Sequence, residues 1–155
     1  MDMIFRPMAK NDQDEMRALF DEMSEESAAF FNGGRCNKIL TMRFFTDEGV
    51  PTHEFYVACD GDAVLGYAFV WDMNKTVPWF GICVREKFKG QHVGTFLLSN
   101  TLELLQKRGY GGLLLTTAKT NFRGQALYEK CGFERLGVHE CGEYLYLNRF
   151  DFPKG

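Results

Sequence analysis

Residues 79–117 read WFGICVREKFKGQHVGTFLLSNTLELLQKRGYGGLLLTT, and this stretch decides the fold. Its apolar start ends at Val84 and is typical of a strand. After a polar loop, leucines recur at helical spacing from about Val93 to Arg108, and Gly109 is a natural helix stop. A second short apolar strand follows at residues 112–117. Strand, loop, helix and strand in this order predict a βαβ unit with parallel strands and a right-handed crossover.

The loop inside this unit, KFKGQHVGT at residues 87–95, has the features of an anion site without a common nucleotide motif. Gly90 and Gly94 are one residue too close for a P-loop, no lysine follows them, and the G-x-G-x-x-G fingerprint is absent. A helix that opens here nevertheless presents unpaired amides and the positive end of its macrodipole. Lys87 and Lys89 add charge, and the glycines allow a close approach of the backbone. We interpret the loop as a pyrophosphate site; glycines that serve only tight packing are the alternative.

Upstream of this unit the sequence predicts helices and then a hairpin. The pattern indicates a short edge strand at residues 4–7, a helix capped by Asn11, a loop at residues 27–34 and a second helix from residue 39 to near residue 49. The acids along the outer face of the first helix are interpreted as a solvated surface; they are Asp14, Glu15, Asp21 and Glu22.

Strands at residues 54–59 and 63–71 are joined by Asp60-Gly61, which indicates a tight hairpin whose two central residues both need a positive φ. The second of these strands is apolar on both faces, so we expect it at the centre of the sheet. After the βαβ unit the chain continues with a helix capped by Asn121 and running through Lys130, and with a closing β pair at residues 133–138 and 144–147.

Composition and length limit the classes of protein to consider. A chain of 155 residues with 45% apolar and 15% aromatic residues predicts one domain, residues 1–155, with a core rich in Phe and Tyr. The net charge of −3 gives no support to a nucleic-acid partner. No run reaches the ~18 uncharged residues of a membrane span, and the N-terminus lacks the apolar region of a signal peptide. Five scattered cysteines without a C-x-x-C pair predict buried thiols and a cytoplasmic location.

Residues 84–133 carry the motifs of a known family. The signature Arg/Gln-x-x-Gly-x-Gly/Ala at the start of a helix has counterparts in this chain, namely Lys89, His92 and Gly94. Further on, Asn121 and Tyr128 keep the family spacing, and Tyr-Glu-Lys-Cys-Gly-Phe completes the segment. With these residues the chain resembles the acetyl-CoA core of the GNAT superfamily of N-acetyltransferases. The order of elements upstream also suits that family.

The resemblance implies an α/β (α+β) fold of GNAT type: a mixed, mostly antiparallel central sheet of about seven strands, flanked by helices, with one parallel βαβ unit that holds acyl-CoA. It implies transfer of an acetyl group from acetyl-CoA, a co-substrate, to a primary amine of a small molecule or peptide. The amine would attack directly in a ternary complex, with no metal. A catalytically idle module that binds or senses acyl-CoA is the alternative, and a scaffold for a partner protein is a third hypothesis. A monomer and a homodimer are both compatible with the sequence.

The resemblance also implies which residues form the site. Tyr128 is the expected catalytic residue, protonating or stabilising the leaving thiolate. The pantetheine arm is expected along the end of the first parallel strand, and the pyrophosphate on the loop amides. Together with Asn121 and Tyr128, the expected cofactor-binding residues are Ile82, Cys83, Val84, Lys89, Gly90, Gln91, His92, Val93, Gly94 and Thr95. A role as helix N-cap explains Asn121 equally well.

Two residues depart from the family signature. Lys89 keeps a hydrogen-bond donor but loses the planar fork of an arginine. His92 places a side chain where the family often has none, and we expect it to be exposed beside the pyrophosphate. If this position has a positive φ, a histidine there costs stability.

The acceptor side is expected from the loop between the first two helices and the turn before the last strand. Carboxylates beside aromatic rings suit a cationic amine, and the candidate substrate residues are Glu26, Phe31, Trp79 and Glu140. No general base is singled out, because the strand at residues 77–84 carries neither an acid nor a histidine. A water relay and five side chains near the expected site stay open: His53, Glu54, Asp72, His139 and Glu140. Cys83 and Cys131 lie in apolar contexts and are expected to be inert thiols.

Overall fold

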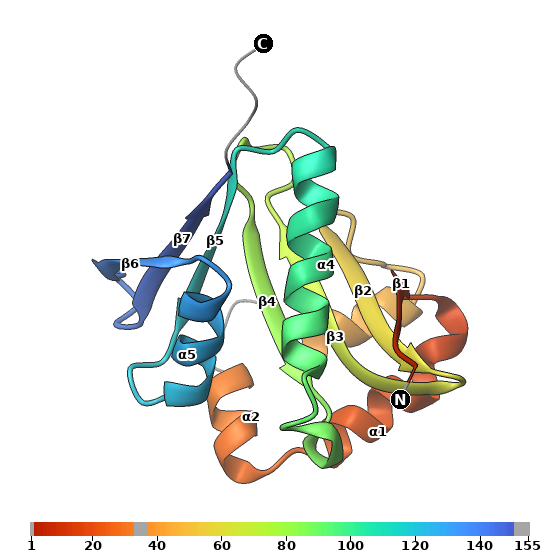
Figure 1. Ribbon diagram of the computed structural model, residues 1–155. Helices are drawn as coiled ribbons and strands as arrows, with labels where there is room; N and C mark the ends of the chain where they lie inside the picture. The colour runs from red at the N-terminus through yellow and green to blue at the C-terminus, as the bar shows by residue number, and fades with distance from the viewer. Residues whose placement is uncertain (1, 33–36, 151–155) are drawn as a thin grey trace.

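The computed structural model describes residues 2–32 and 37–150, with the side chains of residues 31 and 32 excepted. Within these residues, seven strands form one sheet in the order β1-β2-β3-β4-β5-β7-β6 (Figure 1). The strands are β1 (Ile4–Pro7), β2 (His53–Asp60), β3 (Ala63–Trp71), β4 (Trp79–Val84), β5 (Gly112–Thr117), β6 (Glu134–Val138) and β7 (Tyr144–Arg149). The α-helices are α1 (Gln13–Asp21), α2 (Glu25–Asn32), α3 (Lys38–Met42), α4 (Val93–Lys107) and α5 (Phe122–Lys130). Short 3₁₀ turns lie at η1 (Lys10–Asp12), η2 (Arg43–Phe45) and η3 (Glu86–Phe88).

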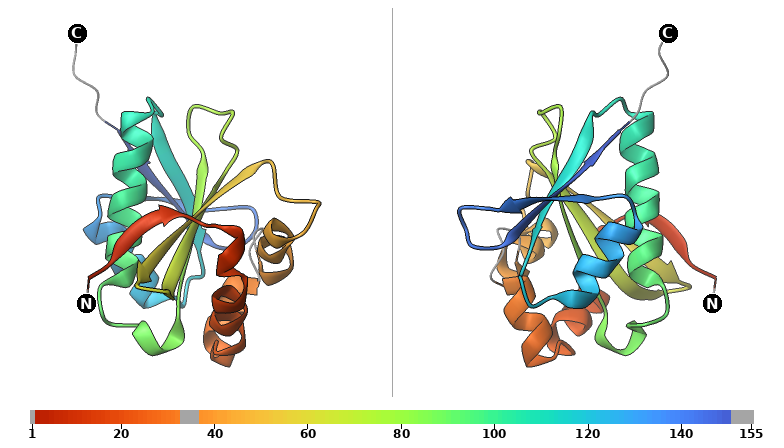
Figure 2. Two further views of the ribbon diagram at one scale, coloured as in Figure 1. Left: turned by 90° about the vertical axis from the view of Figure 1, so that its right-hand side faces the viewer. Right: turned by 60° about the vertical axis from the view of Figure 1, so that its left-hand side comes forward.

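Neighbouring strands are antiparallel throughout the described sheet except for β4 and β5, which confirms the expected mixed, mostly antiparallel fold. Helices cover both faces: α4 and α5 pack on one face, and α1 and α3 pack on the other (Figure 2). The leucine stripe of α4 forms the first layer, since Leu98, Leu102 and Leu105 are 0%, 8% and 0% exposed. Burying such a side chain contributes about 1.5–3 kcal/mol relative to leaving it in water. None of the helices that the structure describes is both long and apolar enough to cross a membrane.

β2 and β3 form the expected hairpin, and β3 is buried along nearly its whole length between β2 and β4. The turn differs from the prediction. Only Gly61 has a positive φ (+60°), whereas Asp60 and Asp62 stay in the ordinary region. Asp60 pairs with Ala63 as the last strand pair, so Gly61 is the first of two turn residues. One glycine at that position is enough for a hairpin turn in which only the first central residue has a positive φ.

β4 and β5 pair only at their amino ends, where Trp79 lies opposite Leu114 and the Leu114 amide donates to the Pro78 carbonyl (2.9 Å). Beyond this point β4 stays paired with β3 as far as Val84, and β5 stays paired with β7 as far as Thr117. The two parallel strands therefore diverge toward their carboxyl ends (Figure 1). The sheet opens where the loop to α4 and the start of α5 lie.

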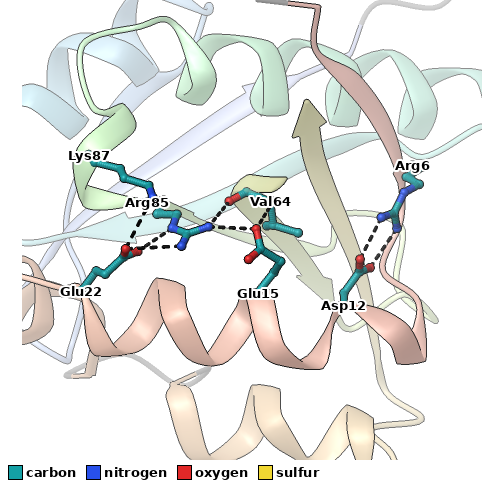
Figure 3. A network of polar contacts seen from close by, with 7 residues as sticks. All are labelled: Arg6, Asp12, Glu15, Glu22, Val64, Arg85 and Lys87. Carbon is teal, nitrogen blue, oxygen red and sulfur yellow. Dashed lines mark hydrogen bonds and ion pairs between the residues drawn. The ribbon is translucent and has the colours of Figure 1, made fainter. Parts of the chain in front are cut away.

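The predicted cap of the first helix is wrong. Asn11 lies within η1, and the carboxylate of its neighbour Asp12 accepts a hydrogen bond from the Ala9 amide (2.8 Å). Asp12 is 4% exposed and also holds Arg6 of β1 through two bonds of 2.8 Å. This arginine is the main reason why the pKa of the Asp12 carboxyl lies below its usual value. The pair joins the edge strand to the start of α1 (Figure 3).

The predicted loop at residues 27–34 and the long second helix are also wrong. The chain is already helical from Glu25, because the Ser24 hydroxyl accepts a hydrogen bond from the Ser27 amide (3.1 Å) and so caps α2. Gly33 and Gly34, on which the loop prediction depended, lie outside the described residues. The next helix ends early: α3 stops at Met42, and η2 continues it only to residue 45.

The acids of α1 and Glu22, the residue that follows it, are not all a solvated surface. Arg85, which follows β4 and is 5% exposed, binds two of them (Figure 3). Its guanidinium contacts a carboxylate oxygen of Glu15 (3.0 Å) and both oxygens of Glu22. The backbone amide of Arg85 donates to the Leu65 carbonyl (2.8 Å). One buried arginine therefore fixes the start of the loop below β4 against α1 and β3.

Candidate functional site

A cavity of about 1110 Å³ opens where β4 and β5 diverge. Its walls come from β4, from the loop and first turn of α4, from the end of β5, from α5, from α2 and from the turn between β6 and β7. All the sequence-predicted cofactor residues line it except Gln91, which is exposed and lies outside the lining. Of the predicted substrate residues, Glu26, Trp79 and Glu140 line it, and the side chain of Phe31 lies outside the described part of the chain.

Backbone amides converge at the first turn of α4. The first helical hydrogen bond runs from the Phe96 amide to the His92 carbonyl (3.0 Å), so the amides of residues 93–95 precede the helical pattern. Gly90, with φ of +80°, turns the preceding loop toward them, while the Lys89 amide already closes η3 onto the Glu86 carbonyl (3.3 Å). We call the N–H groups of residues 90–95 the amide cradle. Together with the helix dipole they form a site suited to an anion.

The two glycines of this loop have different roles. A Cβ at Gly90 would meet no atom within 4 Å, so Gly90 is needed for its backbone conformation. A Cβ at Gly94 would lie 3.2 Å from the Leu127 side chain and 3.7 Å from that of Val84. Gly94 therefore allows α4 to pack closely against α5 and β4. The alternative interpretation, in which the glycines serve only tight packing, is therefore correct for Gly94. It does not explain Gly90.

The two lysines of the loop are paired with acids. The Lys89 ammonium lies 3.0 Å from Glu86 and donates to the Ser27 hydroxyl of α2. Lys87 lies 3.7 Å from Glu22, at the edge of the Arg85 network. An anion on the amide cradle would therefore compete with Glu86 for the Lys89 ammonium.

His92 has the left-handed backbone conformation that its family counterpart, a glycine, adopts freely. It is the residue before α4, with φ of 65° and ψ of 15°, and its side chain is exposed. The left-handed region costs a non-glycine residue about 1–2 kcal/mol, although histidine tolerates it better than most residues. From the sequence we expect a histidine here to cost stability if φ is positive. The φ of His92 is positive, so this backbone strain is present.

Replacing His92 by glycine is expected to leave the free energy of unfolding unchanged or to raise it by up to about 1 kcal/mol. Relief of the left-handed strain exceeds or balances the extra freedom of glycine in the unfolded chain. Gln91→Gly is the matched control, because this exposed neighbour has no positive φ, and its loss should be about 0.5–1 kcal/mol. Urea unfolding measures both variants. An equal loss in the two would show that His92 is not strained.

Tyr128 is buried in α5, 7% exposed, and lines the cavity. Its ring packs against Phe133 (centroids 5.9 Å apart) and Tyr146 (6.2 Å). Within residues 2–32 and 37–150, no group forms a hydrogen bond with its hydroxyl. Burial raises the pKa of the phenol well above its ordinary value, and the charge of Glu143 adds to the shift. Tyr128 thus lines the cavity with a hydroxyl that is protonated and has no hydrogen-bond partner among the described residues.

Asn121 has a complete structural role. Its side-chain oxygen accepts from the Gly124 amide (3.2 Å) at the start of α5, and its amide nitrogen donates to the Thr117 hydroxyl (3.0 Å). The predicted N-cap is confirmed. Asn121 also lines the cavity, so a ligand contact through its remaining hydrogen-bonding capacity stays a prediction.

Three of the five side chains that the sequence left open as bases lie away from the cavity lining: His53, Glu54 and Asp72. Glu54 is held by Arg108 through bonds of 2.8 and 3.1 Å, and the ring of His53 stacks on Trp71, 5.9 Å away. Burial lowers the pKa of His53. His139 and Glu140 do line the cavity.

The sequence missed two further acids of the cavity: Glu86, which is paired with Lys89, and Glu143, which immediately precedes β7. Thr116 of β5 donates a hydrogen bond to the carboxylate of Glu143 (2.9 Å). The only signal in the sequence was its position between a glycine-containing turn and an apolar strand. That pattern does not show which side chains of β5 will lie near Glu143 in the folded chain.

Aromatic rings form the wall next to the β6–β7 turn. Trp79 stacks on Trp71 (6.2 Å) and meets the edge of His139 (5.9 Å). The indole N–H of Trp71 is buried without a hydrogen-bond partner among the described residues. Glu26 and Glu140 are exposed at the rim. A ligand that combines an apolar body with a positive charge fits such a wall.

The cysteines follow the sequence prediction only in part. Cys59 and Cys83 are buried, and burial raises the pKa of Cys83 to about 12, as expected for an inert thiol. Cys131 is half-buried, and burial raises its pKa as well. The prediction is wrong for Cys141, which is exposed in the turn before β7, because no apolar layer covers that turn. Cys36 lies outside the described residues.

Comparison with known proteins places the fold and the cavity in context. The sequence model of the acetyltransferase (GNAT) family matches residues 14–133. The chain is 30% identical over 123 residues to the uncharacterized protein ML0378 of Mycobacterium leprae, covering 76% of this chain and 33% of that protein. It is 30% identical over 106 residues to the uncharacterized N-acetyltransferase YvbK of Bacillus subtilis, covering 68% and 66%. A putative [ribosomal protein bS18]-alanine N-acetyltransferase of B. subtilis is 25% identical over 93 residues, covering 60% and 61%. The chain thus spans from a third to about two thirds of the length of these relatives.

Solved structures share the fold at low sequence identity. The PaiA N-acetyltransferase from Thermoplasma acidophilum, in complex with coenzyme A, superposes with a TM-score of 0.76 at 13% identity, covering 97% of this chain and 100% of that one. The GNAT domain of the S. lividans protein PAT superposes with a TM-score of 0.80 at 14% identity, covering 94% and 89%. At these identities the likeness is one of fold.

Proposed function

The chain belongs to the GNAT family of acetyltransferases, and on this premise we propose that it transfers an acetyl group from acetyl-CoA to a primary amine. The acceptor is a small molecule or a peptide, and its amine attacks the thioester directly in a ternary complex. The observation that carries the proposal is the divergence of β4 and β5, with the amide cradle and the Tyr128 hydroxyl on the walls of the resulting cavity.

The geometry suits each part of an acyl-CoA. Residues 81–84 of β4 are paired with β3 on one edge, and the other edge faces the gap that β5 leaves. An extended pantetheine arm can bind that edge as an added strand would, contacting Ile82, Cys83 and Val84. The pyrophosphate then lies on the amide cradle, with the Lys89 ammonium within reach after it leaves Glu86. The acyl group points toward Tyr128 and the aromatic wall.

Two named proteins support the donor and the acceptor of this proposal. The T. acidophilum neighbour was solved with coenzyme A, and one B. subtilis relative is named for acetylation of an alanine in a ribosomal protein. Both are consistent with an acyl-CoA donor and an amine acceptor here. The rim acids Glu26 and Glu140 and the ring of Trp79 would attract and contact a cationic amine. A single domain, a cytoplasmic location and the choice between monomer and homodimer stay predictions from the sequence.

The second candidate is a catalytically idle module that binds acyl-CoA. One observation favours it: His92 occupies a strained position in the amide cradle, where the family signature has a glycine. The imidazole of His92 takes up space beside the amide cradle and so hinders the approach of a phosphate. This hypothesis predicts that the protein binds acyl-CoA but does not transfer the acyl group.

Titration calorimetry with acetyl-CoA is the first test, and we expect a dissociation constant below about 1 mM. S-acetyl pantetheine, which lacks the pyrophosphate, is the matched control ligand and should bind at least about tenfold more weakly because it misses the amide cradle. The second test is amine-dependent release of the free thiol from acetyl-CoA, with n-butylamine, phenethylamine and short peptides with a free N-terminal alanine or lysine as acceptors.

The outcomes separate the candidates. Binding with amine-dependent thiol release supports the acetyltransferase. Binding without release for any of these amines favours the idle module. Absence of binding at millimolar acetyl-CoA contradicts both and leaves the partner-protein scaffold.

A further inference from the structure

Glu143 is held in the cavity from two sides. Its carbonyl accepts a hydrogen bond from the His139 amide (2.7 Å), which closes the turn before β7. Its carboxylate accepts from the Thr116 hydroxyl of β5 (2.9 Å), and both side chains line the cavity. A carboxylate fixed by a strand and a tight turn is better positioned than one on a free loop.

Glu143 differs from the other carboxylates of the cavity in its partners. Glu86 is neutralised by Lys89 at 3.0 Å, and Glu26 and Glu140 are exposed to solvent. Glu143 is half-buried, and no lysine or arginine of the described residues forms an ion pair with it. A half-buried carboxylate without a counter-charge gains from a cationic ligand.

The charged groups around Glu143 do not supply that counter-charge. Lys119, from the loop after β5, and Arg135, from β6, both lie over the ring of Tyr144, 5.8 and 3.9 Å from its centroid. His139 faces the edge of Trp79. Tyr128 of α5 lines the same cavity, and the charge of Glu143 contributes to the raised pKa of its phenol. The acid and the phenol therefore border the same space.

We propose that Glu143 binds the ammonium group of the acceptor and acts as the general base of the transfer. This inference rests on the proposed acetyltransferase function and adds to it the residue that the strand before the loop does not provide. Glu143 approaches the amine from the β7 side of the opened sheet, next to the aromatic wall. Thr116 is the positioning residue that orients its carboxylate.

The proton balance of the step is complete. Glu143 takes one proton from the ammonium, and the neutral amine then attacks the thioester carbonyl carbon. The carbon–sulfur bond breaks as the carbon–nitrogen bond becomes an amide. The second ammonium proton leaves the nitrogen and ends on the sulfur, near the Tyr128 hydroxyl, to give the free thiol of coenzyme A. The proton on Glu143 passes to solvent, which restores the carboxylate.

Glu143→Gln is the test, with phenethylamine, n-butylamine and the N-terminal alanine peptide as acceptors. We expect kcat at pH 7 to fall about a hundredfold, the lower end for general-base catalysis, because water can reach a half-buried position. With the two alkylamines the residual rate should rise about tenfold per pH unit between about pH 7 and 9, because an alkyl ammonium with a pKa near 10.4 loses its proton in solution. With the alanine peptide the rise should level off near pH 8, because an α-amino group has a pKa of about 7.7–8.0. The wild-type rate should rise less steeply. The affinity for acetyl-CoA should stay within about twofold, which shows that the variant is folded.

Three further variants complete the design. Glu134→Gln removes an exposed carboxylate of β6 outside this cavity and should leave kcat unchanged. Glu143→Asp keeps a carboxylate and should recover part of the rate. Thr116→Val removes the orienting hydroxyl and should lower kcat by about tenfold at unchanged acetyl-CoA affinity.

The outcomes distinguish this inference from the function on which it rests. A wild-type protein that binds acetyl-CoA but releases no thiol with these amines overturns the acetyltransferase, and Glu143 as its base with it. An active wild-type protein whose Glu143→Gln variant keeps kcat within about threefold overturns the inference alone. A variant that only raises KM, with an unchanged pH profile, reduces Glu143 to a binding residue and also overturns the role of base.

Discussion

Arg85→Ala is expected to lower the free energy of unfolding by about 3 kcal/mol. The arginine is 5% exposed, and its guanidinium holds Glu15, Glu22 and the Val64 carbonyl (Figure 3). Removing one member of a buried ionic network costs about 3–5 kcal/mol, because the remaining groups lose their partner. The lower end applies here, since the side chains of Glu15 and Glu22 are 33% and 37% exposed and water can reach them in the variant.

Urea unfolding of the purified protein measures the change, with the slope of the transition checked against that of the wild type. Lys107→Ala is the matched control: it removes a cation from an exposed pair with Glu103 (2.8 Å) and should cost less than about 0.5 kcal/mol. Arg85→Lys keeps the charge but not the planar fork, so we expect a loss between the two. A loss below about 1 kcal/mol for Arg85→Ala would falsify the structural role assigned to the network.

The acid dependence of stability provides a second check on the same network. The hydrogen bond from Arg85 is the main reason why the pKa of Glu22 lies below its usual value of 4.5. A depressed pKa stabilises the fold above the unfolded-state pKa, and this contribution disappears as the pH falls through the folded-state value. The wild type should therefore lose this increment below about pH 4.5, and Arg85→Ala should show a flatter acid limb.

The difference between Arg85 and the leucines of α4 shows what the sequence could predict. Leu98, Leu102 and Leu105 repeat within two turns of one helix, so local periodicity was enough to place α4 and the strands on either side of it. Arg85 meets Glu15 and Glu22 only after the chain has folded, and each acid alone reads as a surface residue. Capping at Asp12 depends on Arg6 in the same way. Contacts between residues apart in the sequence therefore explain the errors at the first helix, whereas the helix that begins at Glu25 has a local cause, the Ser24 cap.

The same distinction between local motifs and contacts formed on folding applies to the candidate site. The amide cradle and Tyr128 belong to continuous motifs, so the sequence alone placed them, and both border the cavity. Glu143 enters through the pairing of β5 with β7, which sets Thr116 opposite Leu145. A single sequence contains no local signal for that register. The family resemblance could not supply it either, because it directed attention to the strand before the loop.

Tyr128→Phe is expected to lower kcat on the order of 10²–10³-fold and to leave the acetyl-CoA affinity within about twofold. Phenylalanine retains the ring packing against Phe133 and Tyr146 and removes only the hydroxyl. Tyr128 lines the cavity, and its hydroxyl forms no hydrogen bond with any described residue, so its donor is available to the leaving sulfur of the proposed reaction. Loss of one donor aimed at a developing charge typically costs this much in kcat.

The pH profile of this variant defines the role of the phenol. Burial raises the pKa of Tyr128, so the hydroxyl stays protonated at every pH below that raised value. The deficit in kcat should therefore be constant between about pH 6 and 9, rather than largest in acid. A phenol with a raised pKa is also a weaker acid than a thiol with a pKa near 8.5. In the proposed transfer, Tyr128 would therefore stabilise the departing thiolate by donating a hydrogen bond, and the proton that reaches the sulfur would come from the amine.

Tyr110→Phe provides the matched control for this prediction. Its hydroxyl donates to the Met73 carbonyl (2.8 Å) and lies outside the cavity lining, so the variant should lose about 1 kcal/mol of stability at unchanged kcat. Unchanged turnover in Tyr128→Phe would remove the phenol from the mechanism. In the proposed transfer Glu143 acts on the amine and Tyr128 on the sulfur, so their losses should add in the double variant unless the charge of Glu143 also orients the phenol. A double loss smaller than the product of the two single losses would show that the acid and the phenol function as one unit.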